Sequence, residues 1–193
     1  PFLPVHLLFI NLITDSLPAI AIGMEQGSNE ILKQKPRGMN DSLLNKETLL
    51  QISFEGVIIC IFTMLSYFVG LKTDELLASS MAFGTLCLAR LLHGFNCRSN
   101  LPLYKMPLNY YSIGAFIIGT VLLGWILVSP NFHTIFSISE LNLRHLAMIF
   151  VFATMPSIII QLYINHCGSR TRQYCFSPIS FSTIPKVLKP KWL

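Results

Sequence analysis

Charged residues are scarce in this chain: of its 193 residues only 12% are Asp, Glu, Lys or Arg, whereas 52% are hydrophobic. Soluble domains carry about 25% charged residues, so the composition excludes an ordinary soluble domain and indicates a membrane protein. The five cysteines, at positions 60, 87, 97, 167 and 175, lack the spacing of a zinc knuckle or a disulfide scaffold. The chain also opens without a Met, a basic leader or a cleavage site. We therefore expect no signal peptide, and we expect a segment cut from a longer protein.

Long apolar runs are abundant, and they predict an all-α membrane protein with a bundle of five transmembrane helices. A bilayer core is crossed by about 20 mostly apolar residues. The fourth run is the clearest, because no Asp, Glu, Lys or Arg lies between Lys105 and Glu140. We expect residues 1–165 to form one membrane domain and residues 166–193 a basic, poorly ordered cytoplasmic tail. The predicted spans cover about 3–23, 50–70, 77–97, 109–128 and 145–165.

Basic residues are distributed unevenly among the connections between these spans. Cytoplasmic loops carry an excess of Lys and Arg. Two loops, 24–49 and 98–108, share one side with the tail, whereas the other side carries only Lys72 and Arg144. The sequence therefore predicts residue 1 outside the cell and the C-terminus in the cytoplasm. The basic residues on the predicted cytoplasmic side are Lys33, Lys35, Arg37, Lys46, Arg98, Lys105, Arg170, Arg172, Lys186, Lys189 and Lys191.

The first predicted span contains polar residues and a proline in its middle. Asn11, Thr14 and Asp15 are three and four residues apart, which places them on neighbouring faces of a helix. Their amide, hydroxyl and carboxylate oxygens suit a hard cation such as Ca²⁺. Pro18 cannot donate a hydrogen bond to the Thr14 carbonyl, so we expect the helix to be unwound near Asp15–Pro18, as in the broken helices of transporters. The alternative is a polar contact between helices.

Two further ionisable residues lie within spans. Arg90 is about 10 Å and Asp15 about 12 Å from the cytoplasmic end of its span, at a rise of about 1.5 Å per residue. Glu55 also lies in the cytoplasmic third. Three arrangements remain open for Arg90: a pair with Asp15 at the ion site, a pair with Glu55, or a side chain that extends to the headgroups. For His6 and His93 we expect hydrogen-bonded helix residues rather than metal ligands.

Several sequence blocks resemble P-type cation-transporting ATPases, and most of all the calcium-pump group with bacterial-type members. The block N-L-I-T-D at 11–15, followed by S-L-P-A at 16–19, is similar to the sixth transmembrane segment of that family. I-L-K-Q-K-P-R at 31–37 is similar to an element of the following cytoplasmic loop, and residues 79–99 are similar to the eighth segment. The resemblance covers residues 1–165 and identifies them with segments six to ten.

This resemblance implies an ATP-driven Ca²⁺ transporter of which the chain supplies part of the intramembrane site. It implies that Asn11, Thr14 and Asp15 ligate the cation. The 193 residues contain no D-K-T-G phosphorylation motif. Mg²⁺ and ATP are therefore expected only in cytoplasmic domains outside this chain. The implied partners are the lipid bilayer, upstream membrane helices and the catalytic domains, which the loop 24–49 would contact. No nucleic acid partner is expected, and the implied location is a bacterial plasma membrane.

One residue departs from the family pattern. Two-site calcium pumps of this kind have an acidic ligand in the eighth segment, and Arg90 aligns with it. A guanidinium beside the site repels Ca²⁺. The departure predicts one Ca²⁺ per cycle, with Glu55 helping to balance the charge of Arg90. Proton counter-transport is a further expectation, because a vacated Asp15 in hydrocarbon favours protonation.

Other functions stay open at this point. One is a P-type pump for another cation, such as Na⁺, K⁺ or Mn²⁺, because selectivity depends on segments outside the chain. Another is an independent secondary transporter or channel that uses the same distorted helix without ATP. A third is a non-catalytic membrane subunit.

Overall fold

The computed structural model describes residues 2–24, 46–97 and 109–175, and throughout these residues the regular structure is helical. Five helices are long and apolar enough to cross a membrane, which confirms the predicted all-α bundle. They cover Pro4–Gly23, Thr48–Leu71, Glu75–Asn96, Tyr110–Val128 and Leu143–Asn165, close to the predicted bounds. The individual elements are α1 (Pro4–Phe9), the π-helix η1 (Ile10–Asp15), α2 (Ser16–Gly23), α4 (Lys46–Leu71), α5 (Glu75–Asn96), α6 (Tyr110–Val128), α7 (Pro130–Phe136) and α8 (Leu143–Cys175).

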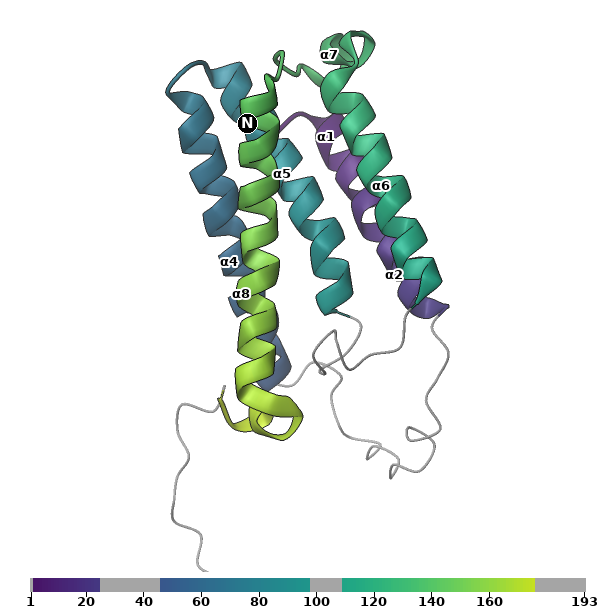
Figure 1. The fold of residues 1–193 in the computed structure, drawn as a ribbon, viewed down its shortest axis with the longest axis vertical. Coiled ribbons are helices and arrows are strands. Elements are labelled where there is room, and N and C mark those ends of the chain that lie inside the picture. Colours follow the sequence, from purple (N-terminus) through teal and green to yellow (C-terminus); the bar gives the residue numbers. More distant parts are fainter. Residues whose placement is uncertain (1, 25–45, 98–108, 176–193) are drawn as a thin grey trace, which may run out of the picture.

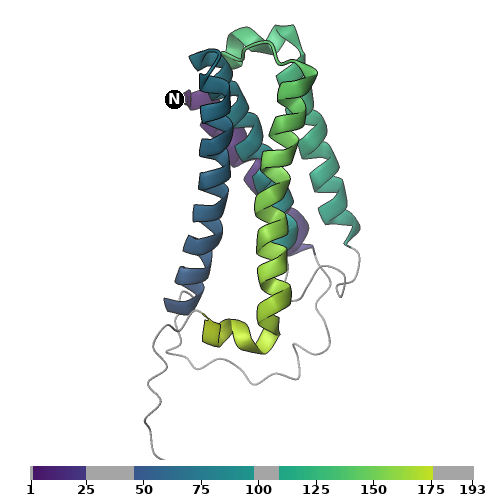
Figure 2. The same ribbon diagram turned by 60° about the vertical axis from the view of Figure 1, so that its left-hand side comes forward.

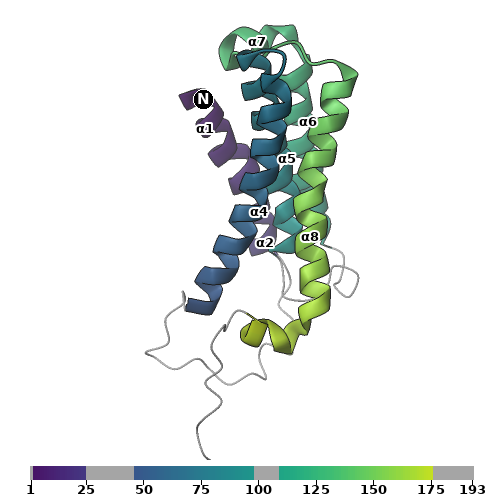
Figure 3. The ribbon, with the colours of Figure 1, turned by 90° about the vertical axis from the view of Figure 1, so that its left-hand side faces the viewer.

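Helix α5 forms the centre of the bundle. In Figure 1 it lies between α4 and α8 on one side and α6 and the first span, Pro4–Gly23, on the other. In Figure 3 it again lies between the first span and α8. In its most apolar window 72% of the residues are buried, against 22% in the first span. Small residues allow this close packing: a Cβ at Gly70 in α4 would lie 2.6 Å from the Cα of Ala78 in α5. Glycine at this position is therefore needed for the tight connection between the two helices.

The two ends of the bundle differ. The α4–α5 turn and α7 lie at the same end of the bundle as α1 (Figure 1). The C-terminal ends of α2, α5 and α8 lie at the opposite end. Helix α7 was not predicted from the sequence; it runs from Pro130 to Phe136, and the next residue, Ser137, adopts a left-handed conformation with φ of 46°. At the opposite end Asn109 accepts hydrogen bonds from two backbone N–H groups of α6 and donates to the Ala21 carbonyl, at 3.2 Å. Asn109 therefore caps α6 and ties α2 to it.

Helix α8 continues beyond its predicted end at residue 165. It extends to Cys175, and its last turns bend away from the rest of the helix (Figure 2). Part of the segment expected to be a poorly ordered tail is thus helical. Residues 176–193, most of the loop 24–49 and the loop 98–108 lie outside the described residues.

The distortion of the first span takes a different form from the one expected. Its backbone stays helical around Asp15 and Pro18, and the irregular part is the π-helix η1, which ends at Asp15. A proline ring clashes with the carbonyl four residues earlier in a regular α-helix, here that of Thr14. The wider turns of a π-helix before the proline accommodate this clash. Pro18 then falls in the first turn of α2, where a missing N–H costs little.

Aromatic rings close the α7 end of the bundle around His6. The His6 ring is 1% exposed and lies 4.5 Å from the ring of Phe83 and 5.9 Å from that of Phe136, between centroids. The N–H of Leu3 donates to Nδ1 at 3.1 Å, so Nε2 carries the proton and donates to the Phe136 carbonyl at 2.6 Å. His6 is a hydrogen-bonded helix residue, as expected, and it fastens α7 to the first span.

Candidate ion-binding site

A cavity of about 630 Å³ lies between the first span, α4 and α5. Most of its lining is apolar, with side chains such as Ile22, Ile52, Ile59, Met64 and Leu86. Four ionisable side chains of opposite kinds also line it: Asp15 from the first span, Glu55 from α4, and Arg90 and His93 from α5. A cavity at membrane depth that gathers such groups is a candidate site for an ion or a proton.

Asp15 and Arg90 form a salt bridge across this cavity. Nη2 of Arg90 lies 2.7 Å from Oδ2 of Asp15, and the two side chains are 39% and 37% exposed. The structure therefore selects the first of the three arrangements considered for Arg90. The similar depth estimated from the sequence allowed this pair as one of three arrangements, because both residues lie at similar distances from the C-terminal ends of their helices.

Glu55 pairs with His93 instead of Arg90. Nε2 of His93 lies 3.4 Å from Oε2 of Glu55, and Nε2 of Gln51 donates to Oε1 at 3.0 Å. This pair is less open than the first, with His93 20% and Glu55 12% exposed. From the sequence we expected His93 to be a hydrogen-bonded helix residue, and its contact with Glu55 was not predicted. The available signal was its position three residues after Arg90, on the same side of α5.

The structure separates the three residues that were expected to ligate a cation. Thr14 and Asp15 line the cavity, whereas Asn11 is exposed and lies outside its lining. Thr14 is buried and its hydroxyl donates to the Ile10 carbonyl at 2.7 Å, which leaves its oxygen lone pairs for another partner. The Asn11 carbonyl accepts a hydrogen bond from the Ser16 hydroxyl at 2.9 Å. The π-helix changes the angular relation that α-helical spacing predicted for these residues.

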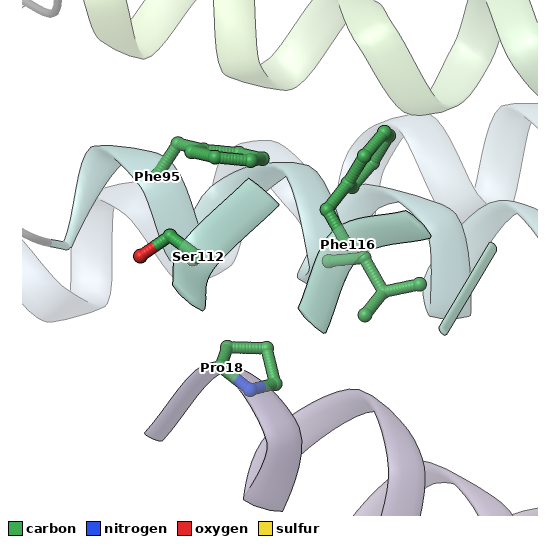
Figure 4. A pocket seen from close by; sticks show the side chains of 6 residues that line it. Pro18, Phe95, Ser112 and Phe116 are labelled. Carbon is green, nitrogen blue, oxygen red and sulfur yellow. The ribbon is translucent and has the colours of Figure 1, made fainter. Parts of the chain in front are cut away.

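Pro18 and Gly94 set the distance between the first span and α5. A Cβ at Gly94 would lie 3.0 Å from the Cβ of Pro18. Figure 4 shows the Pro18 ring directed at the Ser112 and Phe116 side of a small cavity, which has a volume of about 10 Å³. That space is large enough for one water molecule at most. The first span is thus seated firmly on α5 and α6 one turn after Asp15, which fixes the height of the carboxylate relative to Arg90.

The arrangement offers oxygen ligands but no complete metal site. Within the described residues no group of three or more His, Cys, Asp or Glu side chains is suited to hold a metal ion. The carboxylate of Asp15 is compensated by the Arg90 guanidinium, and Thr14 lines the same cavity. A hard cation that entered here would compete with Arg90 for Asp15, and it would take about six to eight oxygen ligands in all.

Comparisons with known proteins show the family of the chain. Residues 1–164 match the family model described as "Cation transporting ATPase, C-terminus". A calcium-transporting ATPase of Listeria monocytogenes is 41% identical over 141 residues, which cover 72% of this chain and 16% of that protein. A calcium-transporting ATPase of Bacillus subtilis is 34% identical over 145 residues, which cover 70% of this chain and 16% of that protein. The chain therefore spans only a small part of the length of these relatives.

The family model covers most of the chain, including the first span with Asp15 and the helix with Arg90. The five apolar helices make the chain a multi-pass integral membrane protein. The chain belongs to the family of cation-transporting ATPases and corresponds to their C-terminal membrane region.

Proposed function

We propose that this chain supplies part of the intramembrane ion site of an ATP-driven Ca²⁺ pump. The observation that supports this proposal best is the Asp15–Arg90 salt bridge, which lies on a π-distorted helix and faces a cavity at membrane depth. Ionisable residues inside a membrane span are costly, and where they occur they mark ion or proton pathways. The relatives in Listeria monocytogenes and Bacillus subtilis are calcium-transporting ATPases, and this favours Ca²⁺ over Na⁺, K⁺ or Mn²⁺.

In this proposal Asp15 is the charged ligand, and Thr14 contributes its hydroxyl oxygen. Asn11 completes the set of this chain, facing the upstream membrane helices instead of the cavity. Ca²⁺ takes about six to eight oxygens, so those upstream helices supply the remaining ligands. Mg²⁺ and ATP bind in the cytoplasmic catalytic domains, which contact the loop 24–49. Residue 1 lies outside the cell and the C-terminus in the cytoplasm, in the plasma membrane of a bacterium.

Arg90 limits the pump to one Ca²⁺ per cycle. Its guanidinium occupies the space beside Asp15 and repels a second divalent cation. The same guanidinium compensates the charge of Asp15 when no cation is bound. Proton counter-transport, which is part of the proposal, then depends on another group of the cavity.

The experiment that tests the proposal compares Asp15→Asn with the unaltered complete pump. We expect the apparent Ca²⁺ affinity for activation of phosphorylation by ATP to fall by about 100-fold or more, because the charged ligand is lost. Asp74→Asn is the matched control, since Asp74 caps α5 at the other end of the bundle and Asn caps equally well. Unchanged affinity in Asp15→Asn would show that Asp15 only packs. Counting bound ⁴⁵Ca²⁺ at saturation tests the stoichiometry: two ions per pump contradict the role of Arg90.

A further inference from the structure

The Glu55–His93 pair is the ionisable group of the cavity that the proposed Ca²⁺ site does not use. We infer that this pair is a proton-binding site, and that Arg90 couples it to the cation site. The inference rests on the proposed function, because it assigns the proton that such a pump would exchange for Ca²⁺. Its ligand is a single proton, held between a carboxylate and an imidazole.

The contacts of the pair suit one bound proton. Oε1 of Glu55 accepts a hydrogen bond from Gln51, so Oε2 is left for His93 at 3.4 Å. Glu55 is 12% exposed, and a carboxylate so little solvated needs a positive or protonated partner. A proton on Nε2 of His93 provides that partner. Nδ1 of His93 is buried and has no hydrogen-bond partner among the described residues, so no backbone contact fixes one tautomer.

The charges around His93 come from three elements. Helix α4 contributes Glu55 and the thiol of Cys60, and the first span contributes Asp15. Helix α5 itself contributes Arg90 and Cys97. Neither residues 112–128 of α6 nor residues 146–165 of α8 include an Asp, Glu, Lys, Arg or His. Glu55 and Arg90 are therefore the charges that decide whether His93 holds its proton.

Arg90 links this proton to the cation. Arg90 and His93 are three residues apart on α5, which places their Cβ atoms about 5–6 Å from each other on neighbouring positions. A cation at Asp15 displaces the guanidinium, and Glu55 is the other carboxylate that lines the cavity. When Arg90 turns to Glu55 it replaces the imidazolium as counter-charge. The N–H bond of His93 then breaks and the proton passes to water on the cytoplasmic side, while Glu55 stays ionised and no electron is transferred.

This coupling predicts a pH dependence with a definite sign. When His93 carries a proton, the imidazolium is the counter-charge of Glu55. Arg90 then stays paired with Asp15, and this pairing opposes the binding of Ca²⁺. Apparent Ca²⁺ affinity therefore falls as the pH is lowered. By linkage, one proton released per Ca²⁺ changes this affinity by up to about tenfold per pH unit.

The experiment measures both quantities on the complete pump, with Ca²⁺ added in the absence of ATP to weakly buffered protein that contains a pH indicator. We expect His93→Gln and Glu55→Gln each to release about one proton fewer per Ca²⁺ than the unaltered pump. Their Ca²⁺ affinity should also lose most of its slope between about pH 6 and about pH 8. His145→Gln, the same change outside the cavity lining, should behave like the unaltered pump.

Unchanged proton release and unchanged pH slope in both folded variants would overturn the inference. If neither variant folds, the unaltered pump decides: the number of protons released per Ca²⁺ must decline as the pH rises through the titration of the pair, and a constant number overturns the inference. The two proposals fail separately. Retained Ca²⁺ activation in Asp15→Asn contradicts the proposed function, whereas normal proton release in the Glu55 and His93 variants contradicts only this inference.

Discussion

Two histidines, His6 and His93, show how differently the two halves of the bundle are built. In the half that contains α7, both ring nitrogens of His6 bond to backbone groups, and aromatic rings surround them. In the half that contains the cavity, His93 faces the carboxylate of Glu55 through one nitrogen, and its other nitrogen has no partner among the described residues. Backbone partners cannot titrate, so His6 is locked in one neutral form. The partner of His93 is itself ionisable, so this residue can exchange a proton.

Position in a span therefore does not determine the surroundings of a polar residue. Both histidines lie in predicted spans, and neither sequence context distinguishes them clearly. Their neighbours do: the α7 half is sealed by packing, whereas the cavity half exposes the Asp15 and Arg90 side chains to 37% and 39%. Substitutions in the first half should change stability without changing cation affinity. Substitutions in the second half should do the reverse.

The largest effect is expected from Gly70→Ala, in the α7 half. The new Cβ would lie 2.6 Å from the Cα and 2.9 Å from the N of Ala78, and backbone atoms cannot rotate away. We expect the free energy of unfolding of the complete pump to fall by about 3 kcal/mol, while the folded fraction keeps its Ca²⁺ affinity. Thermal unfolding and Ca²⁺ titration measure the two properties. Gly114→Ala is the control, since nothing lies within 4 Å of that position.

His6→Leu should give the next largest loss of stability. It leaves the Phe136 carbonyl without its donor and the Leu3 N–H without its acceptor, at a cost of about 2 kcal/mol for buried groups. Ca²⁺ affinity and its pH slope should stay as in the unaltered pump. A changed pH slope in this variant would break the distinction between the two histidines.

Gly94→Ala should have the smallest effect on stability, about 1 kcal/mol, but it should act on the cation site. Its Cβ would press on the Pro18 ring at 3.0 Å and move the first span by a few tenths of an ångström relative to α5. Because this shift disturbs the Asp15–Arg90 geometry, we expect a change of about threefold in apparent Ca²⁺ affinity. Gly23→Ala in the same span is the control, with open space around its Cβ. Equal affinities in both variants would show that Pro18 does not position Asp15.

Hydropathy alone predicted the five spans well, because a helix in hydrocarbon must satisfy all its backbone groups internally. Similar depth also gave the pair between Asp15 and Arg90 as one of three arrangements, and the structure contains it. The other contacts of the site depend on how each helix is rotated about its axis, and the spacing of residues in the sequence does not give that rotation. The Glu55–His93 contact requires a particular rotation of α4 against α5. The exposure of Asn11 follows from the π-helix, and the short helix α7 follows from its packing against His6.

The first span is clamped at both of its ends by one continuous stretch of chain. Near its start His6 bonds to the Phe136 carbonyl at the end of α7, and near its finish the Ala21 carbonyl accepts from Asn109 at the start of α6. These two hydrogen bonds restrain movement of the first span along its axis, whereas the residues between them can still rotate about that axis. The π-helix lies in that interval. Converting it to a regular α-helix would remove one residue from the turn and rotate Asp15 by about 100° about the axis. A change between π-helical and α-helical turns in this interval would therefore change the direction of the Asp15 carboxylate.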